Sequence, residues 1–475
     1  MPIISLSLED RFNPAVTAYL RSAVSSNVKF RTTPNGDSIE PISDPKTIRF
    51  NRYLWSEHPQ VDEAVQHVVH MVHRHGLIPA DIDPIKLYPT AKIIMLNLYN
   101  AHELGADYWV RFSRDKNLIN TPKRYRKSGL NYEHFVMLVK TLKVLRQIQV
   151  ANGFHDRSRY AKTRLSRSRQ SRMKALNIVT IFNGYAILPE HLMRDPKQEL
   201  IEKKYAENER GYKCLLGYDG TVSTHRMRRV LKDYNQLIKA SDIRLNTIPN
   251  KPVDFSDTTV KRVFNNSSWS QGGRFYGGWW QGIKSHFRHD VLINGTPTIE
   301  LDYKALHPFM LHLMRGSTLP EGFDPYSLPQ HDNYEDKKKL RNLCKDFLLI
   351  ALNASTERKA IKAMEEDIRE DKEAGNGRYP DLSHNLRELL ANIKQHNAPI
   401  QDDICTGIGL KLQYYDSRIA ERVIKAMTSE AKPVLCLHDS FRCEAHHKDQ
   451  LNHLMEESFK VIMKSTTHPK IEIKE

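Results

Sequence analysis

Residues 296–314 read TPTIELDYKALHPFMLHLM, a strand-like segment followed by a helical one. The residues at 298–301 predict a strand that leads into Asp302. An aspartate where a strand ends and a helix begins is well placed to hold a cation, because the strand fixes it and the turn exposes it. A helix N-cap is the ordinary alternative for such a residue. The apolar residues after it take helical spacing: Leu306, Phe309, Met310 and Leu313.

A second candidate site lies at residues 432–444, KPVLCLHDSFRCE. The apolar run at 434–437 suits a buried strand, and His438 and Asp439 follow where a hairpin would turn. A surface turn is the ordinary explanation of a lone His-Asp pair. A carboxylate at the tip of a buried hairpin is uncommon, however, so we expect Asp439 to meet Asp302 in space.

Two aspartates on rigid strands are typical of phosphoryl transfer assisted by two divalent ions. Such ions lie about 3.5–4 Å apart and stabilise both the attacking and the leaving oxygen. We therefore predict that Asp302 and Asp439 hold two Mg²⁺ ions, with Mn²⁺ as an alternative.

Residues 336–355, DKKKLRNLCKDFLLIALNAS, offer cations that could neutralise a triphosphate. Arg341 and Lys345 lie four residues apart, so they share one face of the expected helix, and Leu349 and Asn353 continue that face. A routine amphipathic helix with a charged stripe is the alternative.

Residues 268–445 resemble the palm and fingers of family A DNA polymerases and of the related single-subunit, phage-type RNA polymerases. DYKALHP, residues 302–308, is similar to motif A, and LHDSF, residues 437–441, is similar to motif C. RNLCKDFLLIALNAS, residues 341–355, follows the framework of motif B but has Asn-Ala at 353–354, where the family has Tyr-Gly. The resemblance implies a magnesium-dependent nucleotidyltransferase.

The same resemblance implies roles for residues outside the aspartates. Arg274, in the segment before motif A, would contact nucleic acid. Gln413 would reach the primer terminus, with Asp416 as a second candidate on the same segment and Gln401 as an alternative match. His307, five residues past the first aspartate, would screen the 2′-hydroxyl of the incoming sugar and so favour deoxynucleotides. The other expected contacts are nucleotide binding by Tyr303, Leu349 and Asn353 and nucleic-acid binding by His438.

Residues 155–174, HDRSRYAKTRLSRSRQSRMK, contain eight Lys or Arg residues. They follow a segment with helical apolar spacing, and a helix, a short strand and a basic hairpin around 130–175 are similar to a winged helix that grips a duplex. A solvated basic loop is the alternative. We expect phosphate contacts from Arg164, Arg167 and Arg169.

The bulk composition fits a nucleic-acid-binding protein of two or three domains. The chain has 475 residues and a formal net charge of +16, which points to a polyanionic partner. It has five cysteines without a C-x-x-C pair, no signal-peptide pattern and no run of eighteen apolar residues. We therefore expect a cytoplasmic protein with no membrane partner.

The expected fold class is α+β: a right-hand polymerase with an antiparallel palm sheet and helical fingers, after a mainly helical, basic N-terminal region. The expected domains are 1–180 for nucleic-acid binding, 181–250 as a helical thumb-like or linker region, and 251–475 as palm and fingers. The resemblance implies a template-directed DNA polymerase from a phage or mobile-element replication or repair system. Its partners would be a DNA primer-template and nucleoside triphosphates, with RNA as an alternative. The alternative functions are an RNA polymerase or primase, an untemplated nucleotidyltransferase, and a non-catalytic DNA-binding replication factor.

Overall fold

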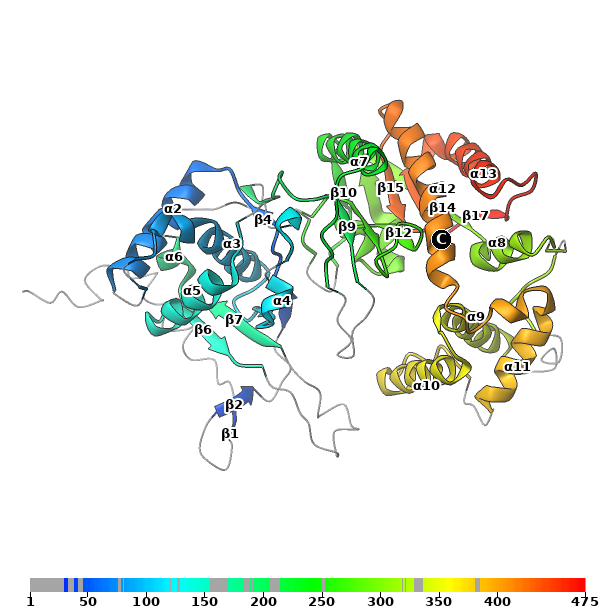
Figure 1. Ribbon diagram of the computed structural model, residues 1–475, viewed down its shortest axis with the longest axis horizontal. Helices are drawn as coiled ribbons and strands as arrows, with labels where there is room; N and C mark the ends of the chain where they lie inside the picture. Colours follow the sequence, from blue (N-terminus) through cyan, green and yellow to red (C-terminus); the bar gives the residue numbers. More distant parts are fainter. Residues whose placement is uncertain are drawn as a thin grey trace, which may run out of the picture. The chain divides into compact units, whose positions relative to one another are not determined.

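The structure is a computed structural model in which the chain forms two compact units (Figure 1). The first unit contains the described residues up to Ile119 together with Leu130–His191, and the second contains Asn120–Gly129 and Leu192–Glu475. The described residues are 30–32, 38–41, 46–75, 78–79, 81–119, 121–125, 129–153, 170–182, 184, 188, 191–205, 214–249, 253–255, 257–317, 319–320, 322–328, 336–380 and 385–474.

The first unit packs helices against a four-stranded sheet of order β3-β5-β7-β6. Its most buried helix is α3, on which even Lys92 is only 3% exposed and bonds Asp62 at 2.5 Å. The elements of this unit are α2 (Pro59–Arg74), α3 (Pro84–Glu103), α5 (Tyr132–Val144), β3 (Thr47–Arg49), β5 (Trp109–Phe112), β6 (Ile148–Ala151), β7 (Ser171–Ala175) and the short helices α4 (Lys116–Ile119) and α6 (Ile178–Ile181).

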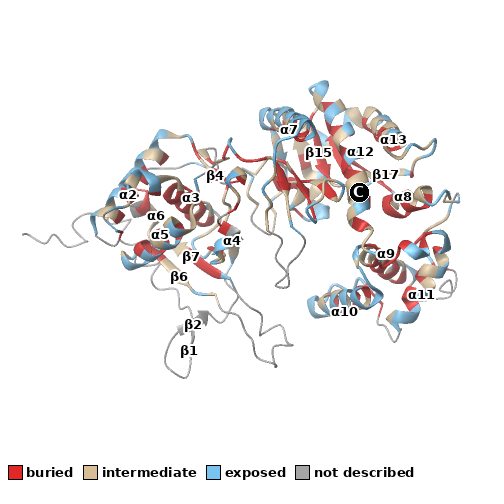
Figure 2. Ribbon diagram, viewed as in Figure 1, coloured by how far each residue is buried: buried red, intermediate tan, exposed pale blue. Residues whose placement is uncertain are grey.

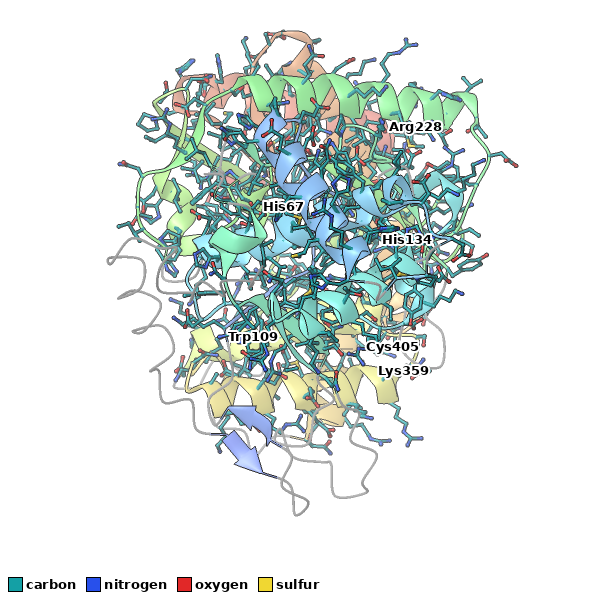
Figure 3. All side chains as sticks on the ribbon, turned by 90° about the vertical axis from the view of Figure 1, so that its left-hand side faces the viewer. His67, Trp109, His134, Arg228, Lys359 and Cys405 are labelled. Carbon is teal, nitrogen blue, oxygen red and sulfur yellow. The ribbon has the colours of Figure 1, made fainter. Side chains whose placement is uncertain are left out.

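Helix α5 and the antiparallel strands β6 and β7 follow the order of the expected helix and hairpin. Trp109 on β5 lies beneath two cations of β7, with its ring 5.4 Å from the Arg172 guanidinium and 5.2 Å from the Lys174 ammonium (Figure 3). These two basic residues therefore take part in the packing of the unit. The connecting segment with Arg164, Arg167 and Arg169 lies outside the described residues, and the winged helix stays a prediction.

The second unit is built on a six-stranded sheet whose order is β10-β13-β14-β16-β15, with β17 also paired to β14. Every pairing in it is antiparallel. The strands are β10 (Ile243–Leu245), β13 (Val291–Ile293), β14 (Thr296–Tyr303), β15 (Val434–Leu437), β16 (Ser440–Glu444) and β17 (Ile471–Ile473). The expected strand before Asp302 and the expected hairpin around Asp439 are confirmed as β14 and β15–β16.

A smaller sheet of order β12-β11-β9 lies in the same unit. Strand β11 (Lys261–Phe264) pairs in parallel with β9 (Ile201–Lys203) and antiparallel with β12 (Gly272–Tyr276). Gly273 has φ 82°, and a Cβ there would come within 2.7 Å of the Phe264 ring. A side chain at this position would therefore displace the strand that carries Arg274.

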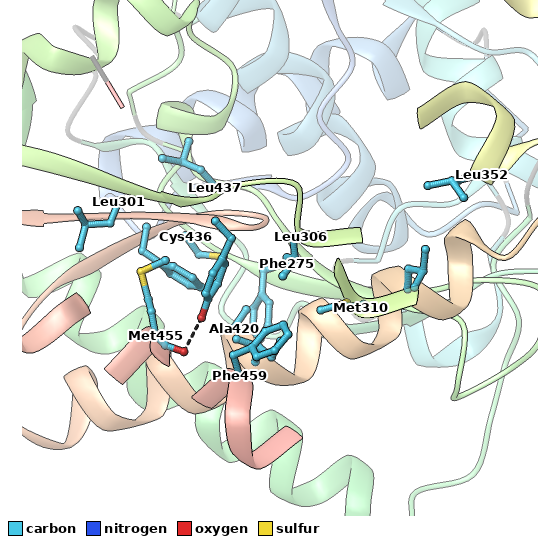
Figure 4. Packing of buried hydrophobic residues seen from close by; sticks show 14 of the residues in the cluster. Phe275, Leu301, Leu306, Met310, Leu352, Ala420, Cys436, Leu437, Met455 and Phe459 are labelled. Carbon is cyan, nitrogen blue, oxygen red and sulfur yellow. Dashed lines mark hydrogen bonds between the residues drawn. The ribbon is translucent and has the colours of Figure 1, made fainter. Parts of the chain in front are cut away.

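Among its described residues the second unit has seven longer helices, and one apolar core joins them to both sheets (Figures 2 and 4). The helices are α7 (Val222–Ala240), α8 (Leu306–Met314), α9 (Lys337–Asn353), α10 (Glu357–Ala374), α11 (Leu386–His396), α12 (Gly409–Ser429) and α13 (Lys448–Met463). In α9 the Asp336 side chain caps the first turn by accepting from the Lys339 amide at 3.1 Å. The expected helices after Asp302 and at 336–355 are confirmed as α8 and α9.

The mixed helix-and-sheet class expected from the sequence is confirmed. The region expected to be helical at 181–250 contains α7 and the short strands β8 (Met193–Arg194), β9 and β10 among its described residues. In the described part of the chain, every helix is too short or too polar to cross a bilayer. The proposed domain roles stay predictions.

Candidate active site

Strands β14 and β16 bring Asp302 and Asp439 together at one end of the sheet. Asp302 stands opposite Ser440 in the antiparallel register, and Asp439 is the residue before Ser440. Residues opposite each other in such a ladder have Cα atoms roughly 4.5–5.5 Å apart. His438, with φ 73°, closes the turn between β15 and β16 in the left-handed region. We call Asp302 and Asp439 the aspartate pair.

The electrostatics of the aspartate pair favour a bound cation. Burial and the neighbouring Asp439 carboxylate raise the pKa of Asp302, although Lys474 acts in the opposite direction. Two neighbouring carboxylates repel each other when both are ionised, and a cation between them relieves that repulsion. Asp302 is 28% exposed, so its carboxylate is accessible to solvent and ions.

Lys474 is a site residue that the sequence analysis missed. Its ammonium donates to Asp302 Oδ2 at 2.9 Å and lies 3.8 Å from Glu300 Oε1. Strand β17 places it there, because Ile471 pairs with Tyr303 and the Lys474 amide donates to the Glu300 carbonyl at 2.9 Å. A single lysine 172 positions from Asp302 shows no local pattern that could have revealed it.

A buried network beneath the aspartate pair ties β14 to β16. Glu300 is 2% exposed, and its two carboxylate oxygens accept from Ser440 Oγ at 2.7 Å and from Arg442 Nη2 at 3.2 Å. A buried carboxylate with such partners strongly favours one register of the two strands, since a slip would leave its charge unpaired. The network therefore positions Asp302 against Asp439.

Arg274, His307 and Asp416 form a second buried cluster beside the aspartate pair. Asp416, on α12, is 2% exposed and accepts from Arg274 Nε at 2.9 Å and contacts His307 Nε2 at 3.0 Å. Arg274 Nη2 also contacts both partners. Burial acts to lower the pKa of Arg274, but Asp416 and, more weakly, Asp439 raise it, so the guanidinium lies within electrostatic range of Asp439.

The structure corrects the expected nucleotide contact of Tyr303. Its side chain points away from the aspartate pair into the core, where its ring lies 6.1 Å from that of Phe459. Its hydroxyl donates to the Met455 carbonyl at 2.6 Å (Figure 4). Successive side chains of a strand point to opposite faces, so Tyr303 cannot share the face of Asp302.

The expected cationic face of α9 is present, but its two cations differ. Arg341 Nε donates to Asp324 Oδ2 at 2.5 Å, whereas Lys345 is exposed and has no ion pair within the described part of the chain. The Arg341 guanidinium also lies 5.4 Å from the ring of Tyr326. Burial and then Asp324 raise the pKa of Tyr326, whereas Arg341 acts to lower it.

Leu349 and Asn353 line a groove of about 550 Å³ between α9 and α10. Asn353 also connects α9 to α12, because Gln413 Nε2 donates to its Oδ1 at 3.5 Å. Gly409 permits this approach, since a Cβ there would come within 2.2 Å of Asn353 Oδ1. The structure thus places Asn353 beside Gln413.

The aromatic residues that follow Arg274 belong mainly to the core. Phe275, Trp279 and Trp280 are 1%, 5% and 1% exposed, so core packing accounts for them better than base stacking. Tyr276 differs, because its ring lies 5.0 Å from that of His438 in the turn that carries Asp439. His438 is half-buried, and burial followed by Arg274 lowers its pKa.

Comparison with known proteins adds little to this geometry. No protein-family model and no curated protein matches the chain. One similar solved structure is the POL domain of Pol1 from M. smegmatis in complex with DNA primer-template and dNTP. The two chains are 11% identical, with a TM-score of 0.26. The similarity covers 53% of this chain and 51% of the Pol1 domain, so this chain spans about half the length of that domain. The functional assignment therefore depends on the site itself.

Proposed function

We propose that this chain is a template-directed DNA polymerase that adds deoxynucleotides to a primer with the help of two Mg²⁺ ions. The observation that carries the proposal is the aspartate pair: one carboxylate on β14 and one in the turn before its neighbour β16 meet at an accessible end of the sheet, and the pKa of Asp302 is raised. Mg²⁺ typically binds proteins through one or two carboxylates and completes its shell with substrate phosphates and water.

The donor set at this end of the sheet fits such ions. The Lys474 ammonium donates a hydrogen bond to Asp302 Oδ2 at 2.9 Å and so compensates part of the negative charge of the aspartate pair. When bound, the ions would stabilise the charge that develops on the attacking and leaving oxygens of nucleotidyl transfer.

The remaining site residues would bind and orient the substrates. The exposed ammonium of Lys345 is available to a triphosphate, and Arg341 would join it by exchanging Asp324 for a phosphate. Asp416 holds His307 where its ring could border the sugar, and Arg274 supplies positive charge beside the aspartate pair. Gln413 and His438 are the proposed contacts to the primer-template.

The basic character of the chain supports a nucleic-acid partner. A net charge of +16 attracts a phosphate backbone irrespective of sequence. We assign phosphate binding to Arg164, Arg167 and Arg169 on this ground and on their clustering in the sequence.

Primer extension on the full chain tests the proposed function against its rivals. We expect Mg²⁺-dependent extension with deoxynucleotides that copies the template. Preferential use of ribonucleotides would identify an RNA polymerase or primase, and extension without template an untemplated nucleotidyltransferase. DNA binding without synthesis under all conditions would contradict the proposal and leave a non-catalytic binding factor.

Replacing Lys474 by methionine is expected to lower the Mg²⁺ concentration needed for half-maximal extension. The lysine competes with a divalent ion for Asp302 Oδ2, and a half-exposed ion pair contributes about 0.4–1 kcal/mol, or roughly twofold to fivefold in apparent affinity. Magnesium titrations of primer extension measure the effect.

The matched control for this variant is Lys470→Met. Lys470 is an exposed lysine next to β17, and its ammonium pairs with Glu472 rather than with Asp302. It should leave the magnesium requirement unchanged. An unchanged or increased requirement in Lys474→Met would show that the ammonium does not compete with the ion.

A further inference from the structure

Three side chains that the proposed polymerase does not use converge where β16 ends. They are Glu444, the last residue of the strand, and His446 and His447 of the short helix η9 (Ala445–His447). Their ligand atoms all lie within 4.8 Å of one another. We propose that these three residues form a binding site for a transition-metal ion, with Zn²⁺ as the best-fitting ion.

Two distances within this histidine–glutamate cluster match a tetrahedral ion. His447 Nε2 and His446 Nε2 lie 3.4 Å and 3.6 Å from Glu444 Oε2. Zinc binds such nitrogen and oxygen ligands at about 2.0–2.2 Å, so the corners of its tetrahedron are about 3.3–3.6 Å apart. Both distances to Glu444 therefore need to change little when the ion binds.

Glu444 is held in place before any ion binds. It is 7% exposed, its backbone pairs with Thr298 on β14, and its Oε1 accepts from Asn294 Nδ2 at 3.2 Å. That hydrogen bond leaves Oε2 directed at the histidines. A ligand oriented by a second partner in this way is common around metal ions in proteins.

The two imidazoles favour a metal ion over an ordinary ion pair. Their ring centroids are 4.0 Å apart, so two protonated rings would repel each other, whereas two neutral rings can share one cation. Lys432, whose charge would oppose a cation here, is paired with Glu430 at 2.7 Å. His446 is 59% exposed, which gives the ion an entry path and a water as fourth ligand.

The donor set and position distinguish this site from the aspartate pair. Imidazole nitrogen suits zinc and neighbouring metals, whereas magnesium prefers oxygen ligands alone. Strand β16 runs from Ser440 to Glu444, and at about 3.4 Å per residue the site lies roughly 14 Å from the catalytic end. A bound ion would fasten the start of α13 to the sheet, so its expected effect is on stability.

Zinc titration of the full-length chain tests the site. The wild-type protein, freed of metal with a chelator, should bind one more equivalent of Zn²⁺ than the variant His446→Ala/His447→Ala in competition with a chromophoric chelator. Zinc should also raise the thermal midpoint of the wild type more than that of the variant. Cobalt as a probe should give a visible absorption band of a four- or five-coordinate ion that the variant lacks.

Two controls separate this site from incidental histidine binding. His289 is an exposed histidine 3.4 Å from Asp290, and no third ligand joins them among the residues that the structure describes, so His289→Ala should bind as much zinc as the wild type. His67 (Figure 3) and His70 are three residues apart on α2, and any zinc they bind remains in all variants. Equal stoichiometry in the wild type and the double variant would overturn the proposal. Magnesium-dependent primer extension serves as a separate readout, because the zinc site does not depend on the proposed function.

Discussion

Asp439→Asn is expected to reduce primer extension by about 10³-fold or more while DNA binding persists. The substitution keeps the shape of the side chain but removes the negative charge that the aspartate pair would offer to two ions. Loss of several kcal/mol of transition-state stabilisation corresponds to a rate decrease of this order. Single-turnover extension measures the rate, and fluorescence anisotropy of a labelled primer-template measures binding.

The control for this variant is Asp290→Asn, which alters the last residue of the short helix η6 (Ser285–Asp290), where the carboxylate lies 3.4 Å from His289. It should extend primers at the wild-type rate. If Asp439→Asn retains extension at a comparable rate, the aspartate pair is not the catalytic centre, and the proposed function loses the observation on which it rests.

Asp416→Ala is expected to lower the free energy of unfolding of the second unit by about 3–5 kcal/mol. The variant leaves the Arg274 guanidinium, 16% exposed, without its carboxylate partner, and a buried charge that loses its partner is strongly destabilising. Denaturation followed by tryptophan fluorescence suits this measurement, because Trp279 and Trp280 lie in the core of the same unit.

The double variant Arg274→Met/Asp416→Leu separates the charge of this pair from its packing. Replacing both charges by apolar side chains of similar size removes the unpaired group, so most of the lost stability should return. Primer extension should remain low, since Arg274 no longer supplies charge beside Asp439. A double variant as unstable as Asp416→Ala would show that the pair contributes mainly shape.

Local patterns in the sequence were sufficient to predict the elements that carry the aspartate pair. Strand β14 and helix α8 follow the expected strand and helix around Asp302, and β15 and β16 form the expected hairpin around Asp439. Helix α9 begins and ends within two residues of its predicted bounds. These predictions succeeded because alternation, helical spacing and turn position are properties of neighbouring residues.

Local sequence patterns could not predict which groups the individual side chains contact. Arg341 was predicted for its spacing from Lys345, yet it bonds Asp324 from the preceding loop. Tyr303 was expected to contact the nucleotide, yet strand alternation turns its side chain into the core. A side chain's environment depends on which elements pack together, and the sequence alone does not state this.

The amino-acid sequence alone determined a net charge suited to a polyanion. It also predicted a strand that leads into Asp302, a hairpin that turns at Asp439 and a helix with a cationic face. Only the tertiary structure placed Lys474 on Asp302, joined Arg274 and His307 through Asp416, and set Glu300 beneath the aspartate pair. The reason is physical: strand and helix formation depend on neighbouring residues, whereas the charge balance of a site depends on groups more than a hundred positions apart that meet only when the sheet closes.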